Sequence, residues 1–139
     1  MHNNLFPQQI DMNQSCDSST ELVLKGTPTL PALIQVAGHN AQQRFIEFFT
    51  AEIRNPGTRS VYAHAVKQFC TWCEHHGVSL TAVSPFAVAA YIEQLTQERS
   101  APTVKQHLSA IRRLFDWLVV GQVLPLNPAA SVRGPKHVV

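Results

Sequence analysis

The sequence lacks the long hydrophobic runs of a membrane protein or a secreted precursor. No apolar stretch approaches the roughly 18 residues that a membrane-spanning helix needs. The first twenty residues show neither the basic start nor the apolar stretch of a signal peptide. Cysteine is scarce, with three residues in a chain of 139. These absences predict a cytoplasmic protein without a membrane partner, in which Cys16, Cys70 and Cys73 are reduced thiols.

The groupings of side chains that form common active sites are also missing. The sequence shows no paired carboxylates for a shared cleft, no Ser/His/Asp arrangement and no Gly-rich phosphate loop. Its Cys-x-x-Cys motif, Cys70 to Cys73, has no second pair to complete a four-ligand zinc site. The motif also falls deep within a predicted helix, whereas redox thiols are activated at helix starts. We therefore predict core packing rather than a metal or redox site, and no cofactor.

Because Cys73 alone falls on the apolar stripe of its predicted helix, the two cysteines are expected to differ. Replacing Cys70 by Ser should be mild. Replacing Cys73 by Ser should cost roughly 1–3 kcal/mol, since it puts a hydroxyl on a buried stripe.

Charged residues are few, and their signs are unevenly distributed. Eleven Lys and Arg against nine Asp and Glu leave a net charge of +2. Residues 1–53 hold two Lys and Arg against five acids, whereas residues 54–139 hold nine against four. Any electrostatic footprint for nucleic acid is therefore expected in the C-terminal part. A solvated helix surface would give much the same bias, so the charge supports nucleic-acid binding without requiring it.

The first two predicted helices are separated by a proline–glycine break. Residues 40–53 carry apolar side chains at helical spacing, with Asn40 as the expected N-cap. The run Asn55-Pro56-Gly57 ends this helix. Thr58 is the expected cap of the second helix, which Gly77 closes.

Two further helices complete the predicted fold. Ser84-Pro85 places an N-cap before a proline at the first helical position. Ser100 opens the fourth helix, which ends near Gly121. No β-branched alternation competes, and the connections are short. The sequence therefore predicts an all-α fold, a compact bundle of four main helices over residues 39–121.

The two tails are predicted to lie outside the bundle. Residues 1–38 show no sustained period and are expected to be a mobile N-terminal leader, with an ordered turn near residues 30–36. Residues 122–139 are expected to be an extended linker. Trimming the leader, or truncating near Gly121, should then leave the bundle folded.

The fourth predicted helix has two contrasting faces. Its apolar residues at positions 104, 108, 111, 115 and 118 lie within a narrow arc at about 100° per residue. Gln106, Ser109 and Arg113 lie roughly opposite, and the second helix repeats this pattern with His64 and Lys67. Hydroxyls at helix starts suit phosphate oxygens, while Gln, Arg and Lys reach base edges or the backbone. Both helices are therefore candidates for a DNA-binding surface.

These motifs occur in an order that is similar to a known family. The matching stretches are Thr58–Tyr62, Phe69–Cys73, Gly77, Thr103–Phe115 and Asn127-Pro128. Together they resemble the N-terminal core-binding, SAM-like domain of tyrosine recombinases, the phage integrase family. The segment from Val132 to His137 resembles the linker that leads into the catalytic domain of that family. The resemblance covers about residues 40–139.

The resemblance implies a partner and a binding surface. In this family the domain is a four-helix bundle that clamps one side of a recombination site on double-stranded DNA, with its second and fourth helices toward the major groove. Other recombinase protomers are expected partners in the assembly on DNA. Taken together with the polar helix faces, the resemblance gives these candidate DNA-binding residues: Thr58, Arg59, Ser60, His64, Lys67, Thr103, Lys105, Gln106, Ser109, Arg112, Arg113, Arg133 and Lys136.

The resemblance also implies that this chain alone is not an enzyme. The catalytic arginine, lysine, His-x-x-Arg element and tyrosine nucleophile of the family lie downstream of these motifs, and Tyr62 and Tyr91 are expected in the core. Two other functions remain open. One is a stand-alone helical DNA-binding regulator or truncated competitor of a recombinase, and the other is a protein-interaction bundle.

Overall fold

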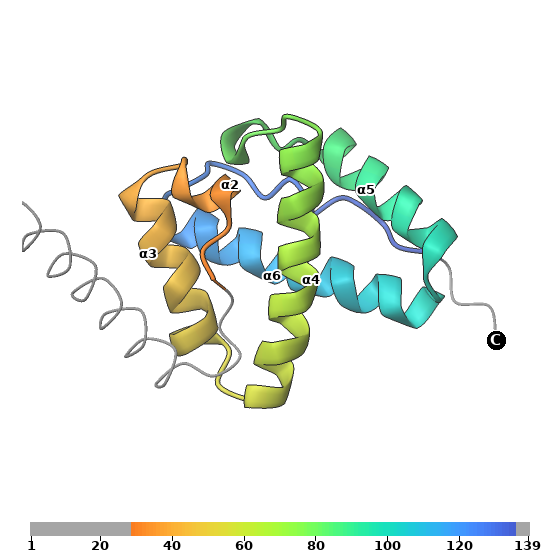
Figure 1. Ribbon diagram of the computed structural model, residues 1–139, viewed down its shortest axis with the longest axis horizontal. Coiled ribbons are helices and arrows are strands. Elements are labelled where there is room, and N and C mark those ends of the chain that lie inside the picture. Colours follow the sequence, from red (N-terminus) through yellow and green to blue (C-terminus); the bar gives the residue numbers. More distant parts are fainter. Residues whose placement is uncertain (1–28, 136–139) are drawn as a thin grey trace, which may run out of the picture.

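The computed structural model describes residues 29–135 of the chain, and these are helical with no strand among them. The all-α prediction is therefore confirmed. Figure 1 shows α6 passing behind α4 at a steep angle, with α3 and α5 on either side. The elements are α2 (Ala32–Gln35), α3 (His39–Glu47), a π-helical turn (Phe48–Glu52), α4 (Pro56–His75), a 3₁₀ turn (Leu80–Ala82), α5 (Pro85–Glu98) and α6 (Ala101–Val120).

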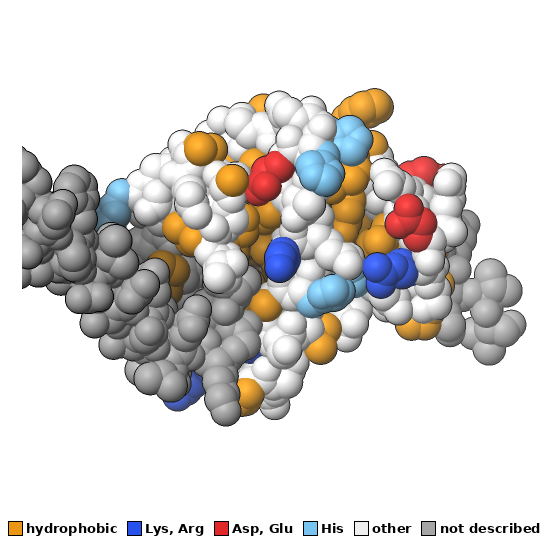
Figure 2. Space-filling model, viewed as in Figure 1, with side chains coloured by type: hydrophobic (Ala, Val, Ile, Leu, Met, Phe, Trp, Pro, Cys, Tyr) orange, Lys and Arg blue, Asp and Glu red, His pale blue; other side chains and the backbone are white. Residues whose placement is uncertain are grey.

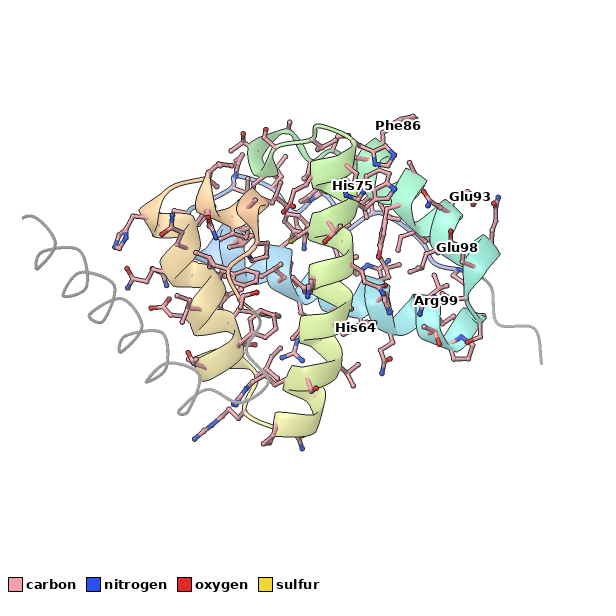
Figure 3. All side chains as sticks on the ribbon, in the orientation of Figure 1. His64, His75, Phe86, Glu93, Glu98 and Arg99 are labelled. Atoms are coloured by element: carbon pink, nitrogen blue, oxygen red, sulfur yellow. The ribbon has the colours of Figure 1, made fainter. Side chains whose placement is uncertain are left out.

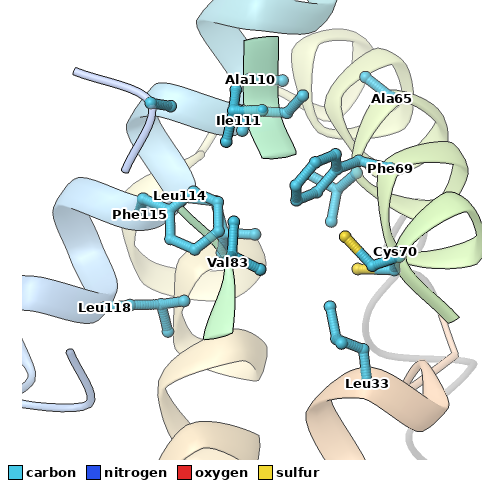
Figure 4. Packing of buried hydrophobic residues seen from close by; sticks show 14 of the residues in the cluster. Leu33, Ala65, Phe69, Cys70, Val83, Ala110, Ile111, Leu114, Phe115 and Leu118 are labelled. Atoms are coloured by element: carbon cyan, nitrogen blue, oxygen red, sulfur yellow. The ribbon is translucent and has the colours of Figure 1, made fainter. Parts of the chain in front are cut away.

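The core is built around α6, which packs against α3, α4 and α5. All five apolar residues expected on its buried stripe are buried, and Leu114 and Ala110 widen that stripe. Figure 4 shows Leu114, Phe115 and Leu118 of α6 in the same cluster as Phe69 of α4. Phe69 meets Phe115 edge to face, with ring centroids 6.0 Å apart. The crossing of α4 over α6 is therefore a packed contact.

The N-cap of α4 is Asn55, three residues before the expected cap Thr58. The Asn55 side chain accepts hydrogen bonds from the backbone N–H groups of Gly57 (2.8 Å) and Thr58 (3.1 Å). Pro56 is the first helical residue, where its missing N–H has no cost. Thr58, expected as the cap, lies inside the helix. The expected Ser84 cap of α5 is confirmed, since its Oγ accepts from Ala87 N–H at 3.1 Å.

The start of α3 also differs from the expectation. Its N-cap is Gly38, which takes a φ of 106° that favours glycine. Asn40 lies within the helix and donates from Nδ2 to the Gly121 carbonyl at 3.2 Å. The side chain expected to cap α3 therefore ties the start of α3 to the end of α6.

The packed core begins before residue 39. The ordered turn expected near residues 30–36 is confirmed as α2, in which Leu33 and Ile34 are buried. The Leu33 N–H donates to Glu74 Oε2 of α4 at 3.0 Å. The part of the leader that precedes residue 29 lies outside the described residues.

The packed core also continues beyond Gly121. Gln122 takes a φ of 62°, and the next residue, Val123, donates its N–H to Leu118 O at 2.9 Å. The chain therefore turns back at the end of α6 and buries Leu124, Ala129 and Val132 (7%, 0% and 7% exposed). The expected domain, residues 39–121, is narrower than this core on both sides. How the chain divides into leader, domain and linker stays a prediction.

These packed segments reverse the expected tolerance to truncation. Deleting residues 1–38 should lower the Tm, because burial of Leu33 and Ile34 contributes roughly 1.5–3 kcal/mol per side chain. Truncation after Gly121 should do the same by removing Leu124 and Val132. Deletion of residues 1–28 is the control, because it keeps these four buried side chains. The account would be contradicted if the full chain, the control and the two shorter chains all melted at the same temperature.

Candidate nucleic-acid interface

A hollow of about 400 Å³ lies between the first turns of α4 and the outer side of α6. It brings together three of the candidate DNA-binding residues, Thr58 from α4 and Gln106 and Ser109 from α6. The remaining lining residues are Gly57, Val61 and Tyr62. Two hydroxyls and one amide thus face a shared space beside an aromatic ring.

Arg113 lies against this hollow through its contact with Tyr62. The guanidinium carbon of Arg113 is 5.5 Å from the centroid of the Tyr62 ring, and its Nη2 is 3.3 Å from Glu52 Oε1. The side chains of Arg113 and Glu52 are 43% and 40% exposed, so the ion pair is weak. Tyr62 was expected in the core, but it is half-buried and lines the hollow.

Two of the expected DNA-binding arginines, Arg59 and Arg112, donate hydrogen bonds to backbone carbonyls. Arg59 donates from Nε (3.3 Å) and Nη2 (3.1 Å) to the Ile53 carbonyl. Arg112 donates from Nε to Ala129 O at 3.1 Å and from Nη2 to Val132 O. Both side chains are half-buried. These hydrogen bonds join separate segments of the chain. Residue type and spacing alone do not distinguish an arginine that makes such bonds from one that binds phosphate.

The other expected residues are more dispersed. Thr103 is half-buried and its Oγ1 accepts from Ser100 Oγ at 2.9 Å. Figure 3 shows His64 on α4. On the face drawn in Figure 2, Lys and Arg side chains are scattered, with acidic side chains among them. Lys136 lies outside the described residues. The exposed members are Ser60, His64, Lys67, Lys105 and Arg133.

A pair of histidine rings also joins α4 to α6. His64 and His107 meet edge to face with ring centroids 6.1 Å apart. His107 is 3% exposed, and its Nδ1 has no hydrogen-bond partner. Burial lowers the pKa of His107, and the nearby His64 and Arg99 lower it further. His107 was not among the residues expected to be buried, although position 107 lies next to the apolar stripe at 104, 108 and 111.

Both thiols of the Cys-x-x-Cys motif are buried in the core, Cys70 at 1% and Cys73 at 0% exposed. Figure 4 shows Cys70 on α4 facing the cluster. Burial raises the pKa of both thiols, that of Cys73 to about 12, so neither is an activated nucleophile. Within residues 29–135, no group of three or more His, Cys, Asp or Glu side chains is placed to hold a metal ion. No helix in that same range is long and apolar enough to cross a membrane.

Cys70 is as buried as Cys73, which removes the reason for expecting a milder effect at Cys70. Serine at either position should lower the free energy of unfolding by roughly 1–3 kcal/mol, since each hydroxyl would be buried among apolar side chains. Urea denaturation measures both, with Thr71→Ser at an exposed position of the same helix as the control. A Cys70→Ser protein as stable as the control would contradict the packing described here.

The buried His107 predicts that acid weakens the fold. Because its pKa is lower in the folded state than in the unfolded chain, the unfolded chain binds more protons near pH 6. The free energy of unfolding should therefore fall as the pH drops from about 7.5 through about 6.5, the ordinary pKa of histidine. His107→Gln should flatten this dependence, and the exposed His75→Gln should keep it. Equal slopes in the two variants would show that His107 is not the group responsible.

Comparison with known proteins places the chain in a family. The model of the phage integrase N-terminal SAM-like domain matches residues 43–121, which is more than half of the chain. Tyrosine recombinase XerD of Chlorobaculum tepidum is 25% identical over 96 residues, covering 68% of this chain and 32% of that protein. Tyrosine recombinase XerC of Escherichia coli O139:H28 is 29% identical over 105 residues, covering 70% and 34%.

The matched region is a part of these relatives. The chain spans about a third of the length of the curated recombinases it matches. No solved structure gives a significant match. The helical bundle seen in residues 29–135 agrees with the matched domain model. The chain therefore belongs to the family of phage integrase N-terminal SAM-like domains.

Proposed function

We propose that this chain is the DNA-binding domain of a tyrosine-type site-specific recombinase or integrase, contacting the core recombination site without cleaving it. The observation that carries the proposal is the hollow between α4 and α6, where Thr58, Gln106 and Ser109 face a shared space beside Arg113. Family membership supports a role in recombination, because the related proteins are named tyrosine recombinases.

The chemistry of the hollow suits a DNA groove. A glutamine amide can donate to and accept from the edge of an adenine, and Gln106 is exposed on α6. Hydroxyl groups such as those of Thr58 and Ser109 bind phosphate oxygens, which position a protein without reading sequence. Arg113 lies over an aromatic ring and is held by one weak ion pair, so it is able to exchange Glu52 for a phosphate.

The tyrosines that the chain contains are poor candidates for a DNA-cleaving nucleophile. The sequence has two, Tyr62 and Tyr91. The Tyr91 hydroxyl is buried without a hydrogen-bond partner, and burial raises its pKa to about 12. Tyr62 is half-buried beneath Arg113. In this proposal, cleavage and rejoining belong to a larger recombinase, assembled on DNA with further protomers.

Gln106 gives a direct test of base recognition. Gln106→Ala should weaken binding to a recombination-site duplex more than binding to a random duplex, because it removes a contact to a base edge. Gln97→Ala, at an exposed position of α5, is the matched control and should bind like the wild type. Fluorescence anisotropy with both duplexes measures the ratio. An unchanged ratio in Gln106→Ala would remove this side chain from the reading of sequence.

The salt dependence of binding tests the phosphate contacts. Each phosphate that the protein neutralises contributes about −0.9 to the slope of log K against log salt concentration. Replacing both Lys105 and Arg113 by Ala should therefore make the slope shallower by up to about 2 while leaving the fold intact, since both side chains are exposed. An unchanged slope would mean that Lys105 and Arg113 do not contact phosphates. Absence of any salt-dependent binding by the wild type would favour the protein-interaction alternative.

A further inference from the structure

The segment that follows α6 runs back along that helix. Asn127 donates from Nδ2 to Asp116 Oδ1 at 2.7 Å, near the C-terminal end of α6. Seven residues later, Gly134 lies beside Lys105, near the start of the helix, where a Cβ on the glycine would be 3.7 Å from Lys105 Cγ. Residues 127–134 are therefore antiparallel to α6 and end beside an exposed lysine.

Arg112 holds the middle of this segment. Its guanidinium donates from Nε to Ala129 O at 3.1 Å and from Nη2 to Val132 O. Its own carbonyl accepts from Asn127 Nδ2 at 3.0 Å. One residue of α6 thus binds the segment at three places. Charged donors bind carbonyl oxygens more strongly than neutral donors do.

The opposite side of the segment is less closely packed. A hollow of about 440 Å³ separates residues 131–135 from the outer side of α5, where Ala89, Glu93 and Thr96 line it. The position of Val132 is therefore determined mainly by Arg112 and by the burial of its own side chain. Arg133 follows directly and is exposed.

We propose that Arg112 is a positioning residue, which holds the Val132 carbonyl so that the exposed Arg133 reaches a DNA phosphate. This inference rests on the proposed DNA-binding function and assigns Arg112 a role different from that of its neighbour. Arg113 contacts DNA directly, whereas Arg112 acts through the segment that it binds. In this proposal Arg113 binds DNA, and its neighbour Arg112 positions the segment that carries Arg133.

A double-mutant cycle separates placement from direct contact. Arg112→Met keeps the aliphatic stem and loses the donors, and Arg133→Ala removes the phosphate contact. Each single change should weaken binding to a duplex several-fold, and the double variant should bind no more weakly than Arg112→Met alone. Losses that multiply in the double variant would mean that Arg112 contacts DNA itself. Wild-type affinity in either single variant would also overturn the proposal.

Amide hydrogen exchange in the free protein tests the tether without DNA. Arg112→Met should speed exchange at Ala130 and Val132, whose N–H groups bond within the segment, and leave the buried stripe of α6 protected. Arg113→Met is the matched control and should not change exchange in the segment. Unchanged exchange in Arg112→Met would overturn the proposal. If the wild type binds no duplex, the proposed function fails, and exchange still decides whether Arg112 holds the segment.

Discussion

The structure depends on the crossing of α4 over α6. Phe69 and Phe115 meet edge to face at this crossing, and His64 meets His107 further along the two helices. Because α6 also packs against α3 and α5, its apolar stripe sets the positions of α3, α4 and α5. The polar side of α6 lies next to the first turns of α4, and Thr58 and Gln106 line the hollow between these two helices. The candidate interface is thus a consequence of core packing.

Hydrophobic periodicity was enough to predict the bundle, because burial of an amphipathic face is a local property of each helix. The stripe of α6 and the Ser84 cap of α5 are both found as expected. The caps of α3 and α4 were misplaced by two and three residues, since Gly38 and Asn55 lie close to other residue types that are also common at N-caps. The core contributions of α2 and of the segment after Gly121 depend on long-range packing, which no short pattern reports.

The candidate site was predicted in part. Exposed side chains opposite an apolar stripe are visible in the sequence, and Thr58, Gln106 and Ser109 do meet around one hollow. The uses of the arginines could not be told apart by residue type, because a guanidinium can donate to a phosphate or to a backbone carbonyl. Arg59 and Arg112 bind carbonyls, while Arg113 pairs weakly with Glu52 across the surface. Only the folded partners distinguish these uses.

The central claim is that DNA binds on the side of the bundle where α4 and α6 form the hollow. Chemical-shift mapping of the protein with a recombination-site duplex tests it most directly. The account predicts that the largest changes fall on residues 57–62 and 105–113, and that the exposed side of α3 around Gln43 is little affected. Changes centred on α3, with the hollow unaffected, would contradict it.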